Sequence, residues 1–207
     1  MKTDRFHGLE PASSWVQRWS HLVKPQGVVL DVACGRGRHA HWFYERNHAL
    51  ALVDISQDAI DSIAKIIPLP SDRCEAVIAD IENGPWPFAG RQFDAVVVTN
   101  YLWRALMPTL LASLLPGGVL IYETFTQGNE TVGKPSRPDF LLRTGELLEV
   151  CSGLRIVAFE EGFHAGPDGG SPRFVQRITA ARETNCASAL PEPQNARTVN
   201  VTRYRLP

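Results

Sequence analysis

The sequence predicts an α/β fold with a doubly wound, mostly parallel sheet that closes in an antiparallel hairpin. Strand and helix patterns alternate four or five times, and two further strand patterns follow them. The first strand patterns are near-continuous apolar runs, which are typical of parallel sheets covered on both faces. Ligands bind such sheets at the carboxyl ends of the parallel strands, so functional residues are expected there.

Apolar runs bounded by turn residues predict five buried strands. Each run is short, and Gly, Pro or Asp residues stand between a strand and the next helix. The predicted strands cover residues 28–32, 49–54, 74–79, 93–100 and 119–125.

Helical spacing of apolar residues predicts the connections between these strands. The first helix begins behind a capping serine, Ser13 or Ser14, and a later one behind Ser56. Pro68 and Pro70 end the helix that Ser56 begins. The predicted helices cover residues 11–23, 37–47, 56–67, 103–115 and 144–151.

The last part of the chain predicts a hairpin and an irregular tail. Residues 154–163 and 173–182 alternate like two strands joined by a turn rich in Gly and Pro. The polar segment 126–142 is expected to be a long loop or lid. From residue 184 onward periodicity is weak, which predicts one domain over residues 1–183 and an irregular C-terminal tail over residues 184–207.

Composition is that of an ordinary globular protein. The chain has 207 residues, of which 44% are hydrophobic and 21% charged, enough for one sizeable core. A net charge of −1 gives no electrostatic case for a nucleic-acid partner. The four widely spaced cysteines predict reduced thiols and no metal site. With no signal peptide and no apolar run long enough to cross a bilayer, a cytoplasmic protein is expected.

The turn after the first strand carries the strongest functional signal. Residues 28–40 run from a buried strand through Gly35 and Gly37 into a helix, as in nucleotide-type cofactor sites. The spacing also fits a dinucleotide fingerprint. Asp31, however, would repel a pyrophosphate at this turn. It suits S-adenosylmethionine (SAM), which has an ammonium, a sulfonium and no phosphate; the alternative is that Asp31 caps the turn and touches no ligand.

Acidic residues also follow the next two strands. Asp54 comes 19 residues after Gly35, where an acid accepts both ribose hydroxyls of a nucleoside. Asp80 lies one strand further along, where it could accept from an adenine amino group. One such acid is weak evidence because Asp is common in turns. Three at one edge of the sheet favour a SAM site.

On these residues the chain resembles the class I SAM-dependent methyltransferases. Residues 30–37 resemble the family's first motif, Asp54 its ribose acid, and Asp80-Ile81 its adenine-side pair. Residues 93–98 and 115–120 resemble its fourth strand and the turn into its fifth. The resemblance covers about residues 11–183 and implies a Rossmann-like, seven-stranded sheet whose last strand is inserted antiparallel.

The resemblance implies a cofactor site around the first turn. It departs from the family pattern at Ala33, where the family often has a glycine. Alanine tolerates a right-handed or extended backbone but not easily a positive φ, so the departure is small. The implied cofactor-binding residues are Asp31, Ala33, Cys34, Gly35, Gly37, Arg38, His39, Asp54, Ile55, Asp80, Ile81 and Asn100.

Within this family the chain is similar to tellurite-resistance-type and related small-molecule methyltransferases. Those enzymes place a histidine and an arginine of the closing hairpin near the substrate, and His164 and Arg173 stand at matching positions. Together with Tyr101, which follows the fourth strand, they are the candidate catalytic residues. Basic residues of the segment 126–142 could hold an anionic acceptor through charge-assisted hydrogen bonds.

Other functions remain open on the sequence alone. A NAD(P)- or flavin-dependent oxidoreductase fits the glycine spacing, but Asp31 and the absence of a Tyr-x-x-x-Lys pair speak against it. A non-catalytic SAM-binding protein is not excluded, because methyl transfer requires no obligatory catalytic residue. Nucleic-acid methylation is disfavoured by the near-neutral charge. The sequence therefore predicts a SAM-dependent methyltransferase of a small-molecule acceptor, acting as a monomer or weak homodimer.

Overall fold

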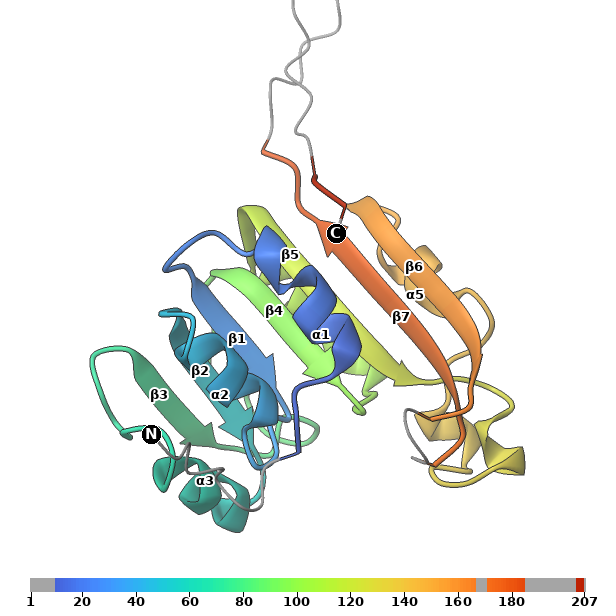
Figure 1. The fold of residues 1–207 in the computed structure, drawn as a ribbon, viewed down its shortest axis with the longest axis horizontal. Coiled ribbons are helices and arrows are strands. Elements are labelled where there is room, and N and C mark those ends of the chain that lie inside the picture. Colours follow the sequence, from blue (N-terminus) through green and yellow to red (C-terminus); the bar gives the residue numbers. More distant parts are fainter. Residues whose placement is uncertain (1–9, 167–170, 185–203, 207) are drawn as a thin grey trace, which may run out of the picture.

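The computed structural model describes residues 10–166, 171–184 and 204–206. They form a seven-stranded sheet in the order β3-β2-β1-β4-β5-β7-β6 (Figure 1). Neighbouring strands among β1–β5 are parallel, whereas β7 is antiparallel to both β5 and β6. This confirms the predicted fold class. The strands are β1 (Val28–Val32), β2 (Ala49–Asp54), β3 (Cys74–Ile78), β4 (Phe93–Thr99), β5 (Leu114–Phe125), β6 (Arg155–His164) and β7 (Arg173–Ala181).

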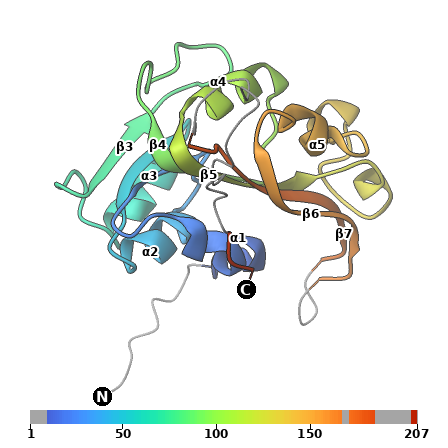
Figure 2. The same ribbon diagram turned by 90° about the horizontal axis from the view of Figure 1, so that it is seen from above.

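Helices cover both faces of the sheet (Figure 2). One face carries α1 (Ser14–Trp19) with the 3-10 turn η1 (Ser20–Leu22), α2 (Arg38–Tyr44) and α3 (Gln57–Ala64). The other face carries α4 (Met107–Ala112) and α5 (Glu146–Val150). Three further 3-10 turns are η2 (Arg104–Leu106), η3 (Asn129–Thr131) and η4 (Pro138–Phe140).

Alternating side chains of the strands build two apolar layers, one on each face. Val96 and Val98 of β4 point into the layer beneath α4 and α5, whereas Val97 points toward α1. Trp15 and Trp19 are fully buried in that second layer, and the Trp15 indole N–H donates to the carbonyl of Ile178 in β7. These contacts fix α1 on the sheet and place residues 10–14 at the carboxyl edge.

Capping follows the sequence prediction. The Ser13 hydroxyl accepts hydrogen bonds from the backbone N–H groups of Trp15 and Val16, and the Ser56 hydroxyl accepts one from Ala59. Both serines thereby satisfy amide groups that the first turn of a helix leaves unpaired.

The boundaries of two predicted elements are wrong. The helix expected at 103–115 is divided into η2 and α4, and β5 begins at Leu114 instead of residue 119. The Pro116-Gly117-Gly118 turn lies within this longer strand, where the register with β4 shifts. Glycine is needed at 118 because a Cβ there would lie 2.8 Å from the carbonyl oxygen of Leu115 and 2.9 Å from that of Phe93.

The segment 126–142 is anchored at both ends. The Thr126 hydroxyl donates to the carbonyl of Leu142, and the Arg104 guanidinium donates to the carbonyls of Asp139 and Leu141. Asn129 is buried and links the segment to β7 by accepting from the backbone N–H of Phe174. The predicted hairpin turn and C-terminal tail lie largely outside the described residues.

Candidate cofactor and acceptor site

A cavity of about 470 Å³ opens at the carboxyl ends of β1 and β4. We call it the turn cavity, because most of its wall is the turn between β1 and α2. It adjoins the residues that follow β4, as expected for a doubly wound sheet. The lining residues are Glu10, Ala33, Cys34, Gly35, Arg36, Arg38, His39, Thr99, Asn100 and Tyr101.

The backbone of this turn has an unusual conformation. Gly35 and Gly37 have φ of 53° and 81°, and Ala33 has φ of 52°. A left-handed conformation costs a non-glycine residue roughly 1–2 kcal/mol. Ala33 therefore does not have the right-handed or extended backbone that alanine prefers, and the turn is strained at this position. A Cβ on Gly35 would meet no atom within 4 Å, so the structure leaves space beside this residue.

Asp31 lies directly beneath the turn. Its side chain is 1% exposed, and its Oδ2 atom has no hydrogen-bond partner among the described residues. Burial raises the pKa of this carboxyl to about 7, although the Arg38 guanidinium and the backbone N–H of Ala40 oppose the rise. A buried carboxylate without a partner is costly, and a cationic ligand group would relieve that cost. Asp31 itself is not among the residues that line the turn cavity.

Asp54 connects the end of β2 to the turn. Its Oδ2 accepts from the backbone N–H of Gly35 at 2.7 Å, and its Oδ1 accepts from that of Ser56 at 2.9 Å. Each carboxylate oxygen has a second lone pair, so both can still accept from a ribose diol. The neighbouring Ile55 is 67% exposed, which leaves an apolar surface next to this acid.

Asp80 follows β3 and organises its own loop. Its carboxylate accepts from the backbone N–H groups of Glu82 and Asn83 and from the Asn83 side chain. These hydrogen bonds, those of Asn83 above all, lower the pKa of Asp80. Asp80 thus performs the turn-capping role that is common for Asp at strand ends. It lies with the half-buried Ile81 at the β3 end of the sheet, beyond the lining of the turn cavity.

His39 joins three segments of the chain. It is 2% exposed, its Nε2 accepts from the backbone N–H of Ser13, and its Nδ1 lies 3.4 Å from the Thr99 hydroxyl. Burial, with Arg38 as a further cause, lowers the pKa of His39 to about 3, so the ring is neutral. Since Nε2 accepts, we assign the ring proton to Nδ1. Burial also raises the pKa of the neighbouring Cys34, which stays a thiol.

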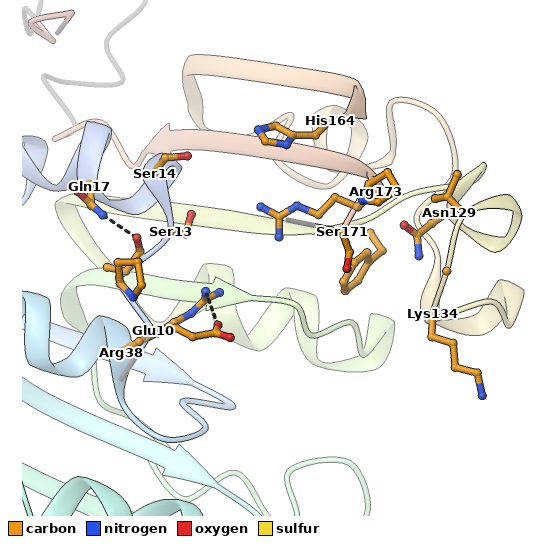
Figure 3. Close-up of a pocket in the computed structure, with 16 residues that line it drawn as sticks. Glu10, Ser13, Ser14, Gln17, Arg38, Asn129, Lys134, His164, Ser171 and Arg173 are labelled. Atoms are coloured by element: carbon orange, nitrogen blue, oxygen red, sulfur yellow. Dashed lines mark hydrogen bonds and ion pairs between the residues drawn. The ribbon is translucent and has the colours of Figure 1, made fainter. Parts of the chain in front are cut away.

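A second cavity, of about 690 Å³, adjoins the turn cavity at Glu10 and Arg38 (Figure 3). We call it the basic cavity because Arg38, Lys134 and Arg173 line it, and Glu10 is the one acidic side chain among its described lining residues. Arg38 is partly neutralised by Glu10 at 3.6 Å. The Nε of Arg173, by contrast, is buried with no hydrogen-bond partner among the described residues. Figure 3 shows its guanidinium reaching into the cavity and Lys134 at the rim.

His164 faces the basic cavity from β6, directly opposite Arg173 of β7. Its Nδ1 accepts from the backbone N–H of Gly166 at 3.0 Å. Burial and then the guanidinium groups of Arg177 and Arg173 lower the pKa of His164, which favours the neutral ring. Because Nδ1 accepts, the proton belongs on Nε2, and the imidazole offers an N–H donor.

A third cavity, of about 210 Å³, lies on the other side of Tyr101. We call it the aromatic cavity. It shares Asn100 and Tyr101 with the turn cavity and Phe125 with the basic cavity. Burial, followed by the Glu82 carboxylate, raises the pKa of Tyr101, so its phenol stays protonated. The lining residues are Glu82, Asn100, Tyr101, Leu102, Thr124, Phe125, Pro135 and Phe140.

The N-terminal segment contributes residues that the sequence did not indicate. Glu10, Ser13, Ser14 and Gln17 line the basic cavity, although their spacing predicts only the start of a helix. Their position depends on where α1 packs, and no local motif encodes that. Within residues 10–166, 171–184 and 204–206, no group of His, Cys, Asp or Glu has the arrangement of a metal site.

Comparison with known proteins finds a family model that matches part of the chain. Residues 29–118, from β1 to the turn within β5, match the family model described as a methyltransferase domain. No curated protein sequence matches the chain.

Solved structures share the fold at low sequence identity. TehB from Haemophilus influenzae superposes with a TM-score of 0.64 and 17% identity, over 79% of this chain and 60% of that one. The chain thus spans about 60% of the length of TehB. A SAM-dependent methyltransferase from Methanosarcina mazei gives 0.63 and 14%, over 85% and 100%. The glycopeptide N-methyltransferase MtfA, complexed with S-adenosyl-L-homocysteine, gives 0.58 and 17%, over 84% and 90%.

Residues 29–118 therefore match a methyltransferase domain, and the chain shares the fold of solved SAM-dependent methyltransferases. The domain match and the shared fold agree with the predicted methyltransferase class. No helix in the described part of the chain combines the length and the apolar character that a membrane crossing requires.

Proposed function

We propose that this protein transfers the methyl group of SAM to a small, anionic acceptor bound in the basic cavity. The observation that carries the proposal is the buried carboxylate of Asp31, whose Oδ2 has no hydrogen-bond partner among the described residues, beneath a strained glycine turn with the basic cavity nearby. A carboxylate in that place suits a cationic cofactor and disfavours a pyrophosphate. An arginine with a buried, unpartnered Nε in the adjoining cavity suits an anion.

The cofactor residues divide into three groups by the part of SAM that they would hold. Asp31 and the backbone carbonyl of Asn100 face the ammonium, and the backbone of Ala33, Cys34, Gly35 and Gly37 lies against the cofactor. Asp54, Ile55, Asp80 and Ile81 form the nucleoside side. Arg38 lines both the turn cavity and the basic cavity, and His39 lines the turn cavity. When bound, SAM supplies an electrophilic methyl group on a sulfonium.

The acceptor residues orient the nucleophile and exclude water. Arg173 and the Nε2–H of His164 donate to the anion, Lys134 adds positive charge at the rim, and Tyr101 closes the passage beside the turn cavity. An acceptor that is already ionised gives up no proton when its bond to the methyl group forms and the carbon–sulfur bond breaks. No general base is then required, and alignment contributes most of the acceleration.

Turnover of SAM tests this proposal. The full chain is incubated with SAM and a panel of small anionic and neutral acceptors, and S-adenosyl-L-homocysteine is quantified. We expect product with at least one anionic acceptor and a large loss of rate in Arg173→Gln, with unchanged SAM affinity. SAM binding without any turnover across the panel would instead identify a non-catalytic SAM-binding protein.

We further propose a cytoplasmic protein that acts as a monomer or weak homodimer, with residues 1–183 as the catalytic domain and residues 184–207 as a peripheral tail. The near-neutral charge and the absence of cysteine pairs among the described residues support this setting. Sedimentation of the full chain checks the oligomeric state, and SAM binding by a chain shortened to residues 1–183 checks the boundary.

A further inference from the structure

The aromatic cavity has a chemistry opposite to that of the basic cavity. Three aromatic residues, Tyr101, Phe125 and Phe140, line it together with the carboxylate of Glu82. Glu82 is the one carboxylate among the described lining residues of this cavity, and after burial it is the largest cause that raises the pKa of the Tyr101 phenol.

Two arginines near the aromatic cavity already have carboxylate partners. Arg104 binds Glu146 through Nε at 2.7 Å, and Arg137 binds Asp139 at 2.8 Å. The Arg137 guanidinium also lies 5.1 Å from the centre of the Phe140 ring. One face of that ring therefore already receives a cation in the structure.

Aromatic faces beside a carboxylate are the surroundings in which proteins bind alkylated ammonium groups. The rings attract the cation through their negative faces, and the carboxylate adds a direct charge. At about 210 Å³ the cavity has room for a group of that size but not for a whole nucleoside-sized ligand.

The two cavities meet at Phe125, which lines both. On one side of this ring Arg173, whose Nε has no partner among the described residues, and the donor His164 favour an anion. On the other side Glu82 and the rings favour a cation. Both cavities also border the turn cavity, through Glu10 and Arg38 on one side and Asn100 and Tyr101 on the other.

We propose that the acceptor is bipolar: its anionic group occupies the basic cavity while an amine or alkylammonium group occupies the aromatic cavity. This inference rests on the proposed function, since it specifies the substrate class of the same site. Because different residues would bind the anionic and the cationic end of the acceptor, a mutation in one cavity should weaken binding of one end only.

Phosphocholine, choline and inorganic phosphate are suitable probes, because phosphocholine joins the two charges that choline and phosphate carry singly. Each is titrated calorimetrically into the full chain saturated with S-adenosyl-L-homocysteine. We expect phosphocholine to bind at least tenfold more tightly than either fragment. Glu82→Gln should weaken choline and phosphocholine about tenfold and leave phosphate unchanged, whereas Arg173→Gln should weaken phosphate and phosphocholine and leave choline unchanged.

Glu45→Gln is the matched control. Glu45 follows the last residue of α2, at the end of the helix away from the turn, and its exposed carboxylate should not alter any of the three affinities. The inference is overturned if S-adenosyl-L-homocysteine binds but choline does not, or if Glu82→Gln leaves choline binding unchanged. Failure of S-adenosyl-L-homocysteine itself to bind would contradict the proposed function instead, so the two outcomes are distinguishable.

Discussion

At the scale of single residues, Asp31 links stability to function. Its carboxyl is buried with one unpartnered oxygen, and burial raises its pKa to about 7. In the ligand-free protein the folded state therefore binds a proton that the unfolded state releases near its ordinary pKa. Stability must fall as pH rises from about 4 to about 7, because in that window the folded state holds more protons than the unfolded state.

Asp31→Asn should remove this pH dependence. Without ligand, the variant should be more stable than the wild type by about 2–4 kcal/mol at pH 8 and by much less at pH 5. It should also lose most of its affinity for SAM, because the ammonium then has no charged partner. Urea denaturation at the two pH values measures the first effect and calorimetry the second. Equal stability of the two proteins at pH 8 would show that burial of the ionised Asp31 carboxylate does not destabilise the folded protein.

The residues at the turn were predictable because their signal is local in sequence. Asp31, Gly35, Gly37 and Asp54 follow from strand ends and spacing, and in the structure Asp54 bonds the Gly35 amide and lies close enough to Asp31 to affect its pKa, although only Gly35 of the four lines the turn cavity. Glu10 carried no such signal, since it reaches the site only through the packing of α1. The positive φ of Ala33 could not be foreseen, because alanine disfavours it and only the surrounding fold imposes it.

At the scale of elements, the two glycines of the β1–α2 turn are needed for different reasons. A Cβ on Gly37 would lie 2.6 Å from the Ile63 side chain, whereas one on Gly35 would meet nothing within 4 Å. Gly37 is thus required for packing against α3. The space beside Gly35 is part of the turn cavity, in which we propose that SAM binds.

Gly35→Ala should therefore mainly weaken SAM binding, whereas Gly37→Ala should mainly lower the stability of the protein. Gly35→Ala should cost about 1–2 kcal/mol of stability from its left-handed backbone but strongly weaken SAM binding. Gly37→Ala should cost more, about 2–4 kcal/mol, because overpacking is added to the same backbone penalty. Urea denaturation and calorimetry on both variants test this. A Gly35→Ala protein with wild-type SAM affinity would rule out ligand contact at this residue.

Besides Thr126 and Asn129, an arginine of η2 anchors the segment 126–142. Arg104 donates to the Glu146 carboxylate, which is 3% exposed, and to the carbonyls of Asp139 and Leu141. The η2 turn thereby meets residues 139–146, which lie 35 to 42 positions later in the sequence, beside the aromatic cavity. Sequence alone predicted a loop here but not this anchor, because the contact joins residues about 40 positions apart.

Arg104→Ala should lower the free energy of unfolding by about 2 kcal/mol, since it leaves a buried carboxylate with only part of its partners. Arg137→Ala is the control: its exposed pair with Asp139 should contribute less than about 1 kcal/mol. Chemical denaturation of the two variants provides the comparison. If Arg104→Ala costs no more than Arg137→Ala, Arg104 does not anchor the segment.

At the scale of the whole molecule, the site is assembled where four parts of the chain converge. The N-terminal segment, the β1–α2 turn, the residues after β4 and the β6–β7 hairpin meet along the carboxyl edge of the sheet (Figures 1 and 3). The order of strands and helices was predictable because alternating patterns allow few topologies. The bounds of β5 were not predictable, because Pro-Gly-Gly usually marks a turn between elements and here it lies within the strand.

The central claim is that the glycine turn binds SAM and not a dinucleotide. Calorimetric titration of the full chain with S-adenosyl-L-homocysteine and, separately, with NADH tests it most directly. We predict binding of S-adenosyl-L-homocysteine, weakened strongly by Asp31→Asn, and no binding of NADH. Binding of NADH without binding of S-adenosyl-L-homocysteine would contradict the account.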